Sequence, residues 1–191
     1  MTKNIRKVSN IRYASIREMD ISNGEGVGVA LFVQGCPFHC YNCFNPDTWD
    51  FNGGKEWTKD TEDKLIELAN KPYIKRLSIL GGEPLADENL DGVLHLVDRF
   101  RLSFPNKSIW IYSGYTLNQV MNPVVTSDFN PERDEVIHKI QEIVRQCTVI
   151  VDGKYIDSQR DITLKWRGSK NQRVIDIQKS LQQNKIILYC D

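Results

Sequence analysis

"VGVALFVQGCPFHCYNC", residues 27–43, joins an apolar run to a short loop that contains three cysteines. Residues 27–33 are apolar and rich in β-branched side chains, and they lie between "NGEG" and Gly35. This pattern predicts a buried strand. Cys36, Cys40 and Cys43 then follow with C-x3-C-x2-C spacing. The stretch therefore places three soft metal ligands directly after the first predicted strand.

The rest of the chain alternates predicted strands with predicted helices. Strands are expected at 74–80, 108–114, 147–153, 161–169 (weaker) and 185–190. Helices are expected at 58–70, 87–100, from Pro131 onward and at 171–183, with an irregular loop at 121–131. Such alternation favours crossover connections and a parallel sheet. A full eight-unit barrel needs about 250 residues, so 191 residues predict one α/β domain, 1–191, folded as a partial, open β/α barrel with a mostly parallel sheet.

Three candidate functional segments follow predicted strands. They are the cysteine loop, "GGEP" at 81–84 and "DGK" at 152–154. In open α/β sheets, ligands bind outside the carboxyl ends of the strands. The sequence therefore predicts that these segments form one site.

Composition excludes several classes of protein. Lys plus Arg and Asp plus Glu both number 25, so the chain lacks the basic excess of a general nucleic-acid binder. No apolar run approaches the ~20 residues of a membrane span. The first ten residues, "MTKNIRKVSN", lack the apolar core of a signal peptide. We therefore expect a cytoplasmic protein that binds neither nucleic acid nor membrane.

The five cysteines indicate metal chemistry more than disulfides. Cytosolic chains rarely keep structural disulfides, and Cys147 and Cys190 lie beside apolar runs, where we expect buried thiols. Thiolates favour zinc, copper(I) or iron–sulfur clusters. A structural zinc site needs a fourth ligand, and His39 would have to fold back to supply it. A four-iron cluster on three cysteines fits better, because one iron stays open to an exogenous ligand.

The two motifs together resemble the radical S-adenosylmethionine (SAM) superfamily. The resemblance implies a 4Fe–4S cluster on Cys36, Cys40 and Cys43, with the amine and carboxylate of SAM on the open iron. Electron transfer would cleave the sulfonium to methionine and a 5′-deoxyadenosyl radical, which abstracts a hydrogen atom.

The same resemblance implies SAM contacts elsewhere in the chain. Glu83 would offer its carboxylate to the SAM ammonium, and glycines before it would let the backbone approach the ligand. Asn42 replaces the aromatic residue that the superfamily usually has there, so we expect backbone contacts to adenine rather than stacking. The full set of implied contacts is Asn42, Cys43, Phe44, Gly81, Gly82, Glu83, Ser113 and Asp152.

From about Asp20 to Ile177 the chain resembles one member family, the anaerobic ribonucleoside-triphosphate reductase activating proteins. The most specific block is "RGSKNQR" at 167–173, whose polar residues either cap and solvate a helix or contact a partner or SAM. The resemblance implies that the substrate is the reductase, activated by a glycyl radical near its C-terminus. It also implies a flavodoxin- or ferredoxin-type electron donor.

Other functions are compatible with the cysteine loop alone. One is another small radical SAM enzyme, such as a formate-lyase activase or a small-molecule modifier, against which "RGSKNQR" argues. A second is a non-catalytic zinc-binding interaction module. A third is a ferredoxin-like electron carrier, which the missing fourth cysteine disfavours.

Overall fold

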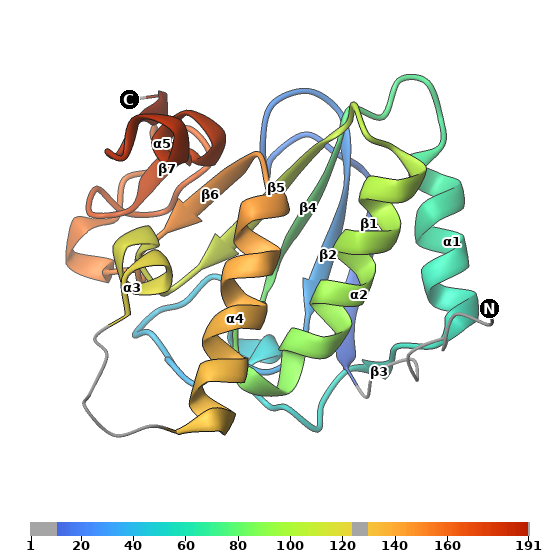
Figure 1. Cartoon of the computed structure of the whole chain (residues 1–191), viewed down its shortest axis with the longest axis horizontal. Coiled ribbons are helices and arrows are strands. Elements are labelled where there is room, and N and C mark those ends of the chain that lie inside the picture. The colour runs from blue at the N-terminus through green and yellow to red at the C-terminus, as the bar shows by residue number, and fades with distance from the viewer. Residues whose placement is uncertain (1–10, 124–129, 191) are drawn as a thin grey trace.

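The computed structural model describes residues 11–123 and 130–190, and it contains one eight-stranded sheet with helices packed on one face (Figure 1). The strand order is β3-β1-β2-β4-β5-β6-β7-β8. The strands are β1 (Arg12–Asp20), β2 (Gly28–Val33), β3 (Lys55–Glu56), β4 (Arg76–Gly81), β5 (Ser108–Ser113), β6 (Val149–Asp152), β7 (Arg173–Asp176) and β8 (Leu188–Cys190). The α-helices are α1 (Lys59–Ala69), α2 (Asp87–Ser103), α3 (Leu117–Met121), α4 (Pro131–Gln146) and α5 (Ile177–Gln183). Short 3-10 turns cover Pro46–Thr48 and Asp157–Gln159.

The sheet is mixed, so the prediction of a mostly parallel sheet is wrong. Strands β2, β4, β5 and β6 are parallel, as predicted from their crossover helices. The pairs β1–β2, β1–β3, β6–β7 and β7–β8 are antiparallel. A short turn is enough to join antiparallel neighbours such as β1 and β2, and no crossover helix marks them in the sequence. The fold is therefore α/β. Its sheet is not closed, and β3 and β8 are the edge strands.

Two sequence-based assignments near the C-terminus are also wrong. Residues 161–169 form turns and bends, with one isolated bridge from Arg160 to Ser169. Residues 171–183 are not one helix, because β7 occupies their first part and α5 begins at Ile177, capped by the Asp176 side chain. The final predicted strand is confirmed in shorter form as β8.

The helix predictions at 58–70, at 87–100 and from Pro131 onward are confirmed as α1, α2 and α4. Thr58 caps α1 by accepting a hydrogen bond from the Thr61 amide. Asn130 caps α4, and Pro131 occupies its first turn. The middle of the predicted 121–131 loop, residues 124–129, lies outside the described residues. None of the helices within 11–123 and 130–190 has the length and apolar character needed to cross a membrane.

The parallel strands send alternate side chains to two different environments. Val29, Leu31 and Val33 of β2 belong to the main core, whereas Ala30 and Phe32 point to the opposite face. Figure 1 shows α2 and α4 side by side on the main-core face, with α1 beside them. The opposite face is bordered by the loop 34–54 and the β6–β7 connection. This arrangement leaves a cavity between the sheet and those loops.

Candidate functional site

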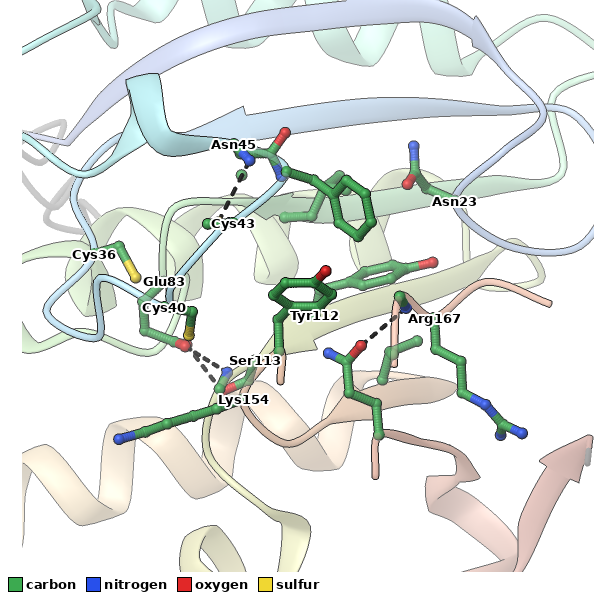
Figure 2. Close-up of a pocket in the computed structure, with 18 of the residues that line it drawn as sticks. Asn23, Cys36, Cys40, Cys43, Asn45, Glu83, Tyr112, Ser113, Lys154 and Arg167 are labelled. Carbon is green, nitrogen blue, oxygen red and sulfur yellow. Dashed lines mark hydrogen bonds between the residues drawn. The ribbon is translucent and has the colours of Figure 1, made fainter. Parts of the chain in front are cut away.

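The three clustered cysteines line a cavity of about 540 Å³ on the face opposite the helices (Figure 2). This volume is typical of small-ligand sites, which range over roughly 300–1,000 Å³. The cavity brings together eight of the predicted site residues: Cys36, Cys40, Cys43, Phe44, Gly81, Gly82, Glu83 and Ser113. Asn42 and Asp152 do not line it. The predicted convergence of the cysteine loop and "GGEP" is therefore present in the fold.

Backbone contacts hold the cysteine loop in a defined shape. The amide of Cys36 donates to the Trp49 carbonyl at 3.0 Å, and the amide of Cys43 donates to the Cys40 carbonyl at 3.1 Å. The amide of Asn45 donates to the Cys43 Sγ at 3.4 Å (Figure 2). Asn42 has a φ of 55°, in the left-handed region that non-glycine residues seldom adopt. An amide donor to sulfur and a strained turn are both typical of loops built to hold a ligand.

The thiols of this loop are free and partly buried. Burial raises the pKa of Cys36, and the nearby Glu83 carboxylate raises that pKa further. Burial also raises the pKa of Cys40, with a contribution from Cys43. Metal ligation requires thiolates, so metal binding at this loop must release the thiol protons. The free energy of metal binding must therefore offset the cost of deprotonating buried thiols.

The donor set fits a cluster better than a single ion. The His39 ring stacks on Trp49, with centroids 4.7 Å apart and an interplanar angle of 20°, and it does not line the cavity. Among residues 11–123 and 130–190, no three His, Cys, Asp or Glu side chains are arranged to hold one ion in common. A four-iron cluster binds each cysteine at a different iron, so its ligands need not meet at one point.

Glu83 is a buried carboxylate at the wall of the same cavity, with 1% of its surface exposed. It accepts hydrogen bonds from the Leu85 amide at 2.9 Å, the Ser113 hydroxyl at 2.9 Å and the Gly114 amide at 2.7 Å. Burial raises the pKa of Glu83 to about 7, although these three donors oppose the shift. A cationic ligand beside this carboxylate would favour its charged form.

This raised pKa predicts a pH-dependent stability for the cluster-free protein. The folded state holds the Glu83 proton more tightly than the unfolded state, so the protein loses stability as pH rises from 4.5, the ordinary pKa, to about 7. The loss is at most about 3 kcal/mol. Urea unfolding at pH 5 and pH 7.5 should show the wild type losing stability relative to Glu83→Gln. A difference between the two proteins that does not change with pH would contradict this assignment.

Gly82 packs the "GGEP" loop directly on the cysteine loop. A Cβ on Gly82 would lie 2.3 Å from the Gly35 carbonyl oxygen, and Gly81 has a φ of 103°. The amide of Glu83 donates to the same Gly35 carbonyl at 2.8 Å. The absence of a side chain at Gly82 permits this contact between the two loops, and both glycines also line the cavity, so close approach of a ligand to them stays a prediction.

Asp152 and Asn42 contact protein groups at the margin of the site. Asp152 is 1% exposed, and its carboxylate accepts hydrogen bonds from Arg173 at 3.0 and 2.6 Å and from the Leu117 amide at 2.7 Å. The Asn42 side chain donates to Asp157 at 3.2 Å. Both therefore connect the sheet edge or the cysteine loop to neighbouring segments.

Comparison with known proteins agrees with this geometry. A family model described as "4Fe-4S single cluster domain" matches residues 22–175. The anaerobic ribonucleoside-triphosphate reductase-activating protein of Escherichia coli K12 is 37% identical over 166 residues, 86% of this chain and 97% of that protein. The proteins of the same name from Vibrio cholerae (37% over 164 residues, 85% and 96%) and phage T4 (33% over 166 residues, 86% and 93%) are also similar.

The chain belongs to this activating-protein family. Its cofactor is a 4Fe–4S cluster, and use of SAM follows from the family. The donor set of the cysteine loop fits such a cluster, as described above.

The "RGSKNQR" block, on which the resemblance to this family most depends, lies at the end of the β6–β7 connection and holds that connection against the cavity. Gln172 accepts from the Gly168 amide at 2.9 Å and donates to the Gly153 carbonyl at 2.9 Å. The Asn171 amide donates to the Lys154 carbonyl at 2.8 Å. Asn171 and Gln172 therefore neither cap a helix nor lie on a solvated helix face, because their side chains bind the backbone of the loop. They fix the loop that forms one wall of the site.

Sequence reasoning missed a buried ion pair that holds the turn between β1 and β2. Arg76 is fully buried, and it donates to Asp20 at 2.7 Å. The Ser78 hydroxyl donates to the Asn23 carbonyl at 2.6 Å, which places Asn23 at the cavity. No pattern within "DISNGEG" indicates a partner that is distant in the sequence. The one signal in the sequence was the alternation of side chains along the predicted strand at 74–80, which places Arg76 and Ser78 on the same face of the sheet.

Proposed function

We propose that this protein activates an anaerobic ribonucleoside-triphosphate reductase by generating a glycyl radical on it, using a 4Fe–4S cluster and SAM. The observation that supports this most strongly is the shared cavity of the C-x3-C-x2-C loop and the buried Glu83. A plain electron carrier would have no need of a cavity beside its cluster. The names of the similar proteins supply the identity of the partner.

Cys36, Cys40 and Cys43 hold the cluster in this proposal. When bound, the cluster supplies the electron for reductive cleavage of SAM. The chain keeps three thiols in one half-buried loop and orients Cys43 through the Asn45 amide. A flavodoxin or ferredoxin is the expected electron donor.

The "GGEP" loop and the end of β5 would bind SAM. Glu83 offers the only buried carboxylate among the described residues that line the cavity, so we assign it to the SAM ammonium. Ser113 orients that carboxylate through its hydroxyl. Backbone groups of Asn42, Cys43 and Phe44 would contact adenine, and Gly81 and Gly82 would set the distance between the two loops. Asp152 would support the site through Arg173 and the Leu117 amide.

The test is anaerobic reconstitution of the protein with iron and sulfide, followed by SAM and dithionite. We expect about four irons per chain and release of 5′-deoxyadenosine and methionine. Addition of the reductase from the same organism should give a glycyl radical by electron paramagnetic resonance. A colourless protein with one bound zinc would favour the interaction module. SAM cleavage without a glycyl radical on a competent reductase would favour another small radical SAM enzyme.

A further inference from the structure

A row of side chains from four parallel strands forms the floor of the cavity. The sheet register pairs Phe32 with Leu80 and Tyr112 with Val151, and all four line the cavity. Each lies one residue before the sheet edge that carries Gly81 and Ser113. The floor is therefore adjacent to the proposed SAM site, but displaced from it toward the amino ends of the strands.

Tyr112 brings a polar group to this apolar floor. Its hydroxyl is inaccessible to solvent and has no hydrogen-bond partner within the described part of the chain. An unsatisfied buried hydroxyl costs roughly 1–3 kcal/mol, and phenylalanine would fill the same space without that cost. Burial raises the pKa of Tyr112, so the hydroxyl stays protonated and can donate. An unpaired group of this kind in a cavity needs an explanation.

Arg167 is a second unpaired donor on the same cavity. Its Nε is buried without a partner, and its guanidinium forms no hydrogen bond or ion pair within 11–123 and 130–190. The neighbouring Ser169, Asn171, Gln172 and Arg173 of the block are all paired. Figure 2 shows Tyr112 between the cysteines and Arg167. Within the described residues, three buried donors on lining residues thus lack partners: Trp49 Nε1, which belongs to the cysteine loop, and the groups of Tyr112 and Arg167, which lie away from the cysteines.

The two donors on Tyr112 and Arg167 call for a ligand that has acceptor oxygens. The apolar floor disfavours a ligand that carries polar side chains at this position. A glycine residue has no side chain, so a site that accepts a glycine segment can recognise it mainly through the main chain. Main-chain carbonyl oxygens are strong acceptors, and each needs a partner when it is buried. A peptide segment that packs against this floor would supply the missing acceptor for each donor.

We propose that Tyr112 and Arg167 bind main-chain carbonyl oxygens of the glycine-containing segment of the protein substrate. This inference rests on the proposed function, because it assumes that a peptide segment enters the cavity. The two residues hold the segment beside SAM and leave SAM binding itself to the cysteine and Glu83 end.

The test uses cluster-loaded, SAM-bound protein and a fluorescent synthetic peptide that covers the reductase's glycine segment. Tyr112→Phe and Arg167→Gln should each raise the peptide Kd about tenfold, as expected for the loss of one to two hydrogen bonds. The Kd for SAM and the iron content should stay close to those of the wild type. Arg167→Gln should keep the wild-type melting temperature, and Tyr112→Phe should melt at a slightly higher temperature, because it removes the unsatisfied hydroxyl. The KM for the intact reductase should rise with the peptide Kd. Matched controls are Tyr73→Phe and Arg145→Gln, which remove the same groups from exposed positions outside the cavity.

The outcomes separate this inference from the proposed function. If the wild type forms a glycyl radical but both variants keep its peptide Kd, the inference is wrong and the function stands. The inference is equally wrong if the variants weaken SAM binding instead of peptide binding. If the wild type neither binds the peptide nor forms a glycyl radical, the proposed function fails and the inference fails with it.

Discussion

Replacing Cys40 by alanine is expected to abolish cluster binding, so that reconstituted protein falls from about four irons per chain to almost none. Cys40 is one of only three clustered thiols, and it shares the cavity with the other two. Removing it leaves only two cysteine ligands for the cluster. The remaining thiols cannot compensate for the lost bond, because the raised pKa of Cys36 already disfavours its thiolate.

Cys147→Ala is the matched control for this experiment. Cys147 is fully buried in the main core, and burial raises its pKa to about 12. It does not line the cavity. Iron and sulfide analysis should show an unchanged cluster in Cys147→Ala. Equal loss of iron in the two variants would show that the ligands have been assigned incorrectly.

Replacing Asp20 by asparagine is expected to cost about 3–5 kcal/mol of folding stability. The carboxylate is 3% exposed and pairs with Arg76, which is fully buried. Without it, the Arg76 cation remains in the protein interior, where its Nε already has no hydrogen-bond partner in the part of the chain that the structure describes. The substitution also removes the charged acceptor for the Asn23 amide, so the turn at the cavity should loosen.

Urea unfolding of the cluster-free protein measures this cost. Glu56→Gln is the control, because Glu56 forms an exposed ion pair with Arg12 at 3.8 Å and should contribute at most about 1 kcal/mol. The double variant Asp20→Asn, Arg76→Met removes both charges and should recover much of the lost stability. A loss below about 1 kcal/mol in Asp20→Asn alone would mean that water or another group compensates for the charge.

Helices and parallel strands were predictable because their signals are local. Thr58 and Asn130 are caps that act within one turn of their helices, and the apolar run before the cysteines is long enough to indicate a buried strand. Strand β1 was not predicted, because most of its side chains are only partly buried or exposed and include several charges. Residues 173–176 were wrongly predicted to be helical, because four residues are too few to distinguish the 3.6-residue period of a helix from the two-residue period of a strand.

The sequence alone indicated Cys36, Cys40 and Cys43 as the proposed cluster ligands, because their spacing is local and thiolates have narrow metal preferences. It also determined that Glu83 follows a strand end. Only the tertiary structure decided what surrounds these groups. Glu83 meets Ser113 and Gly114 because β4 and β5 are parallel neighbours. Strand order and register likewise leave the hydroxyl of Tyr112 on the cavity floor without a partner among residues 11–123 and 130–190. Contacts between residues that are distant in the sequence depend on how strands are paired, and no local pattern encodes that pairing.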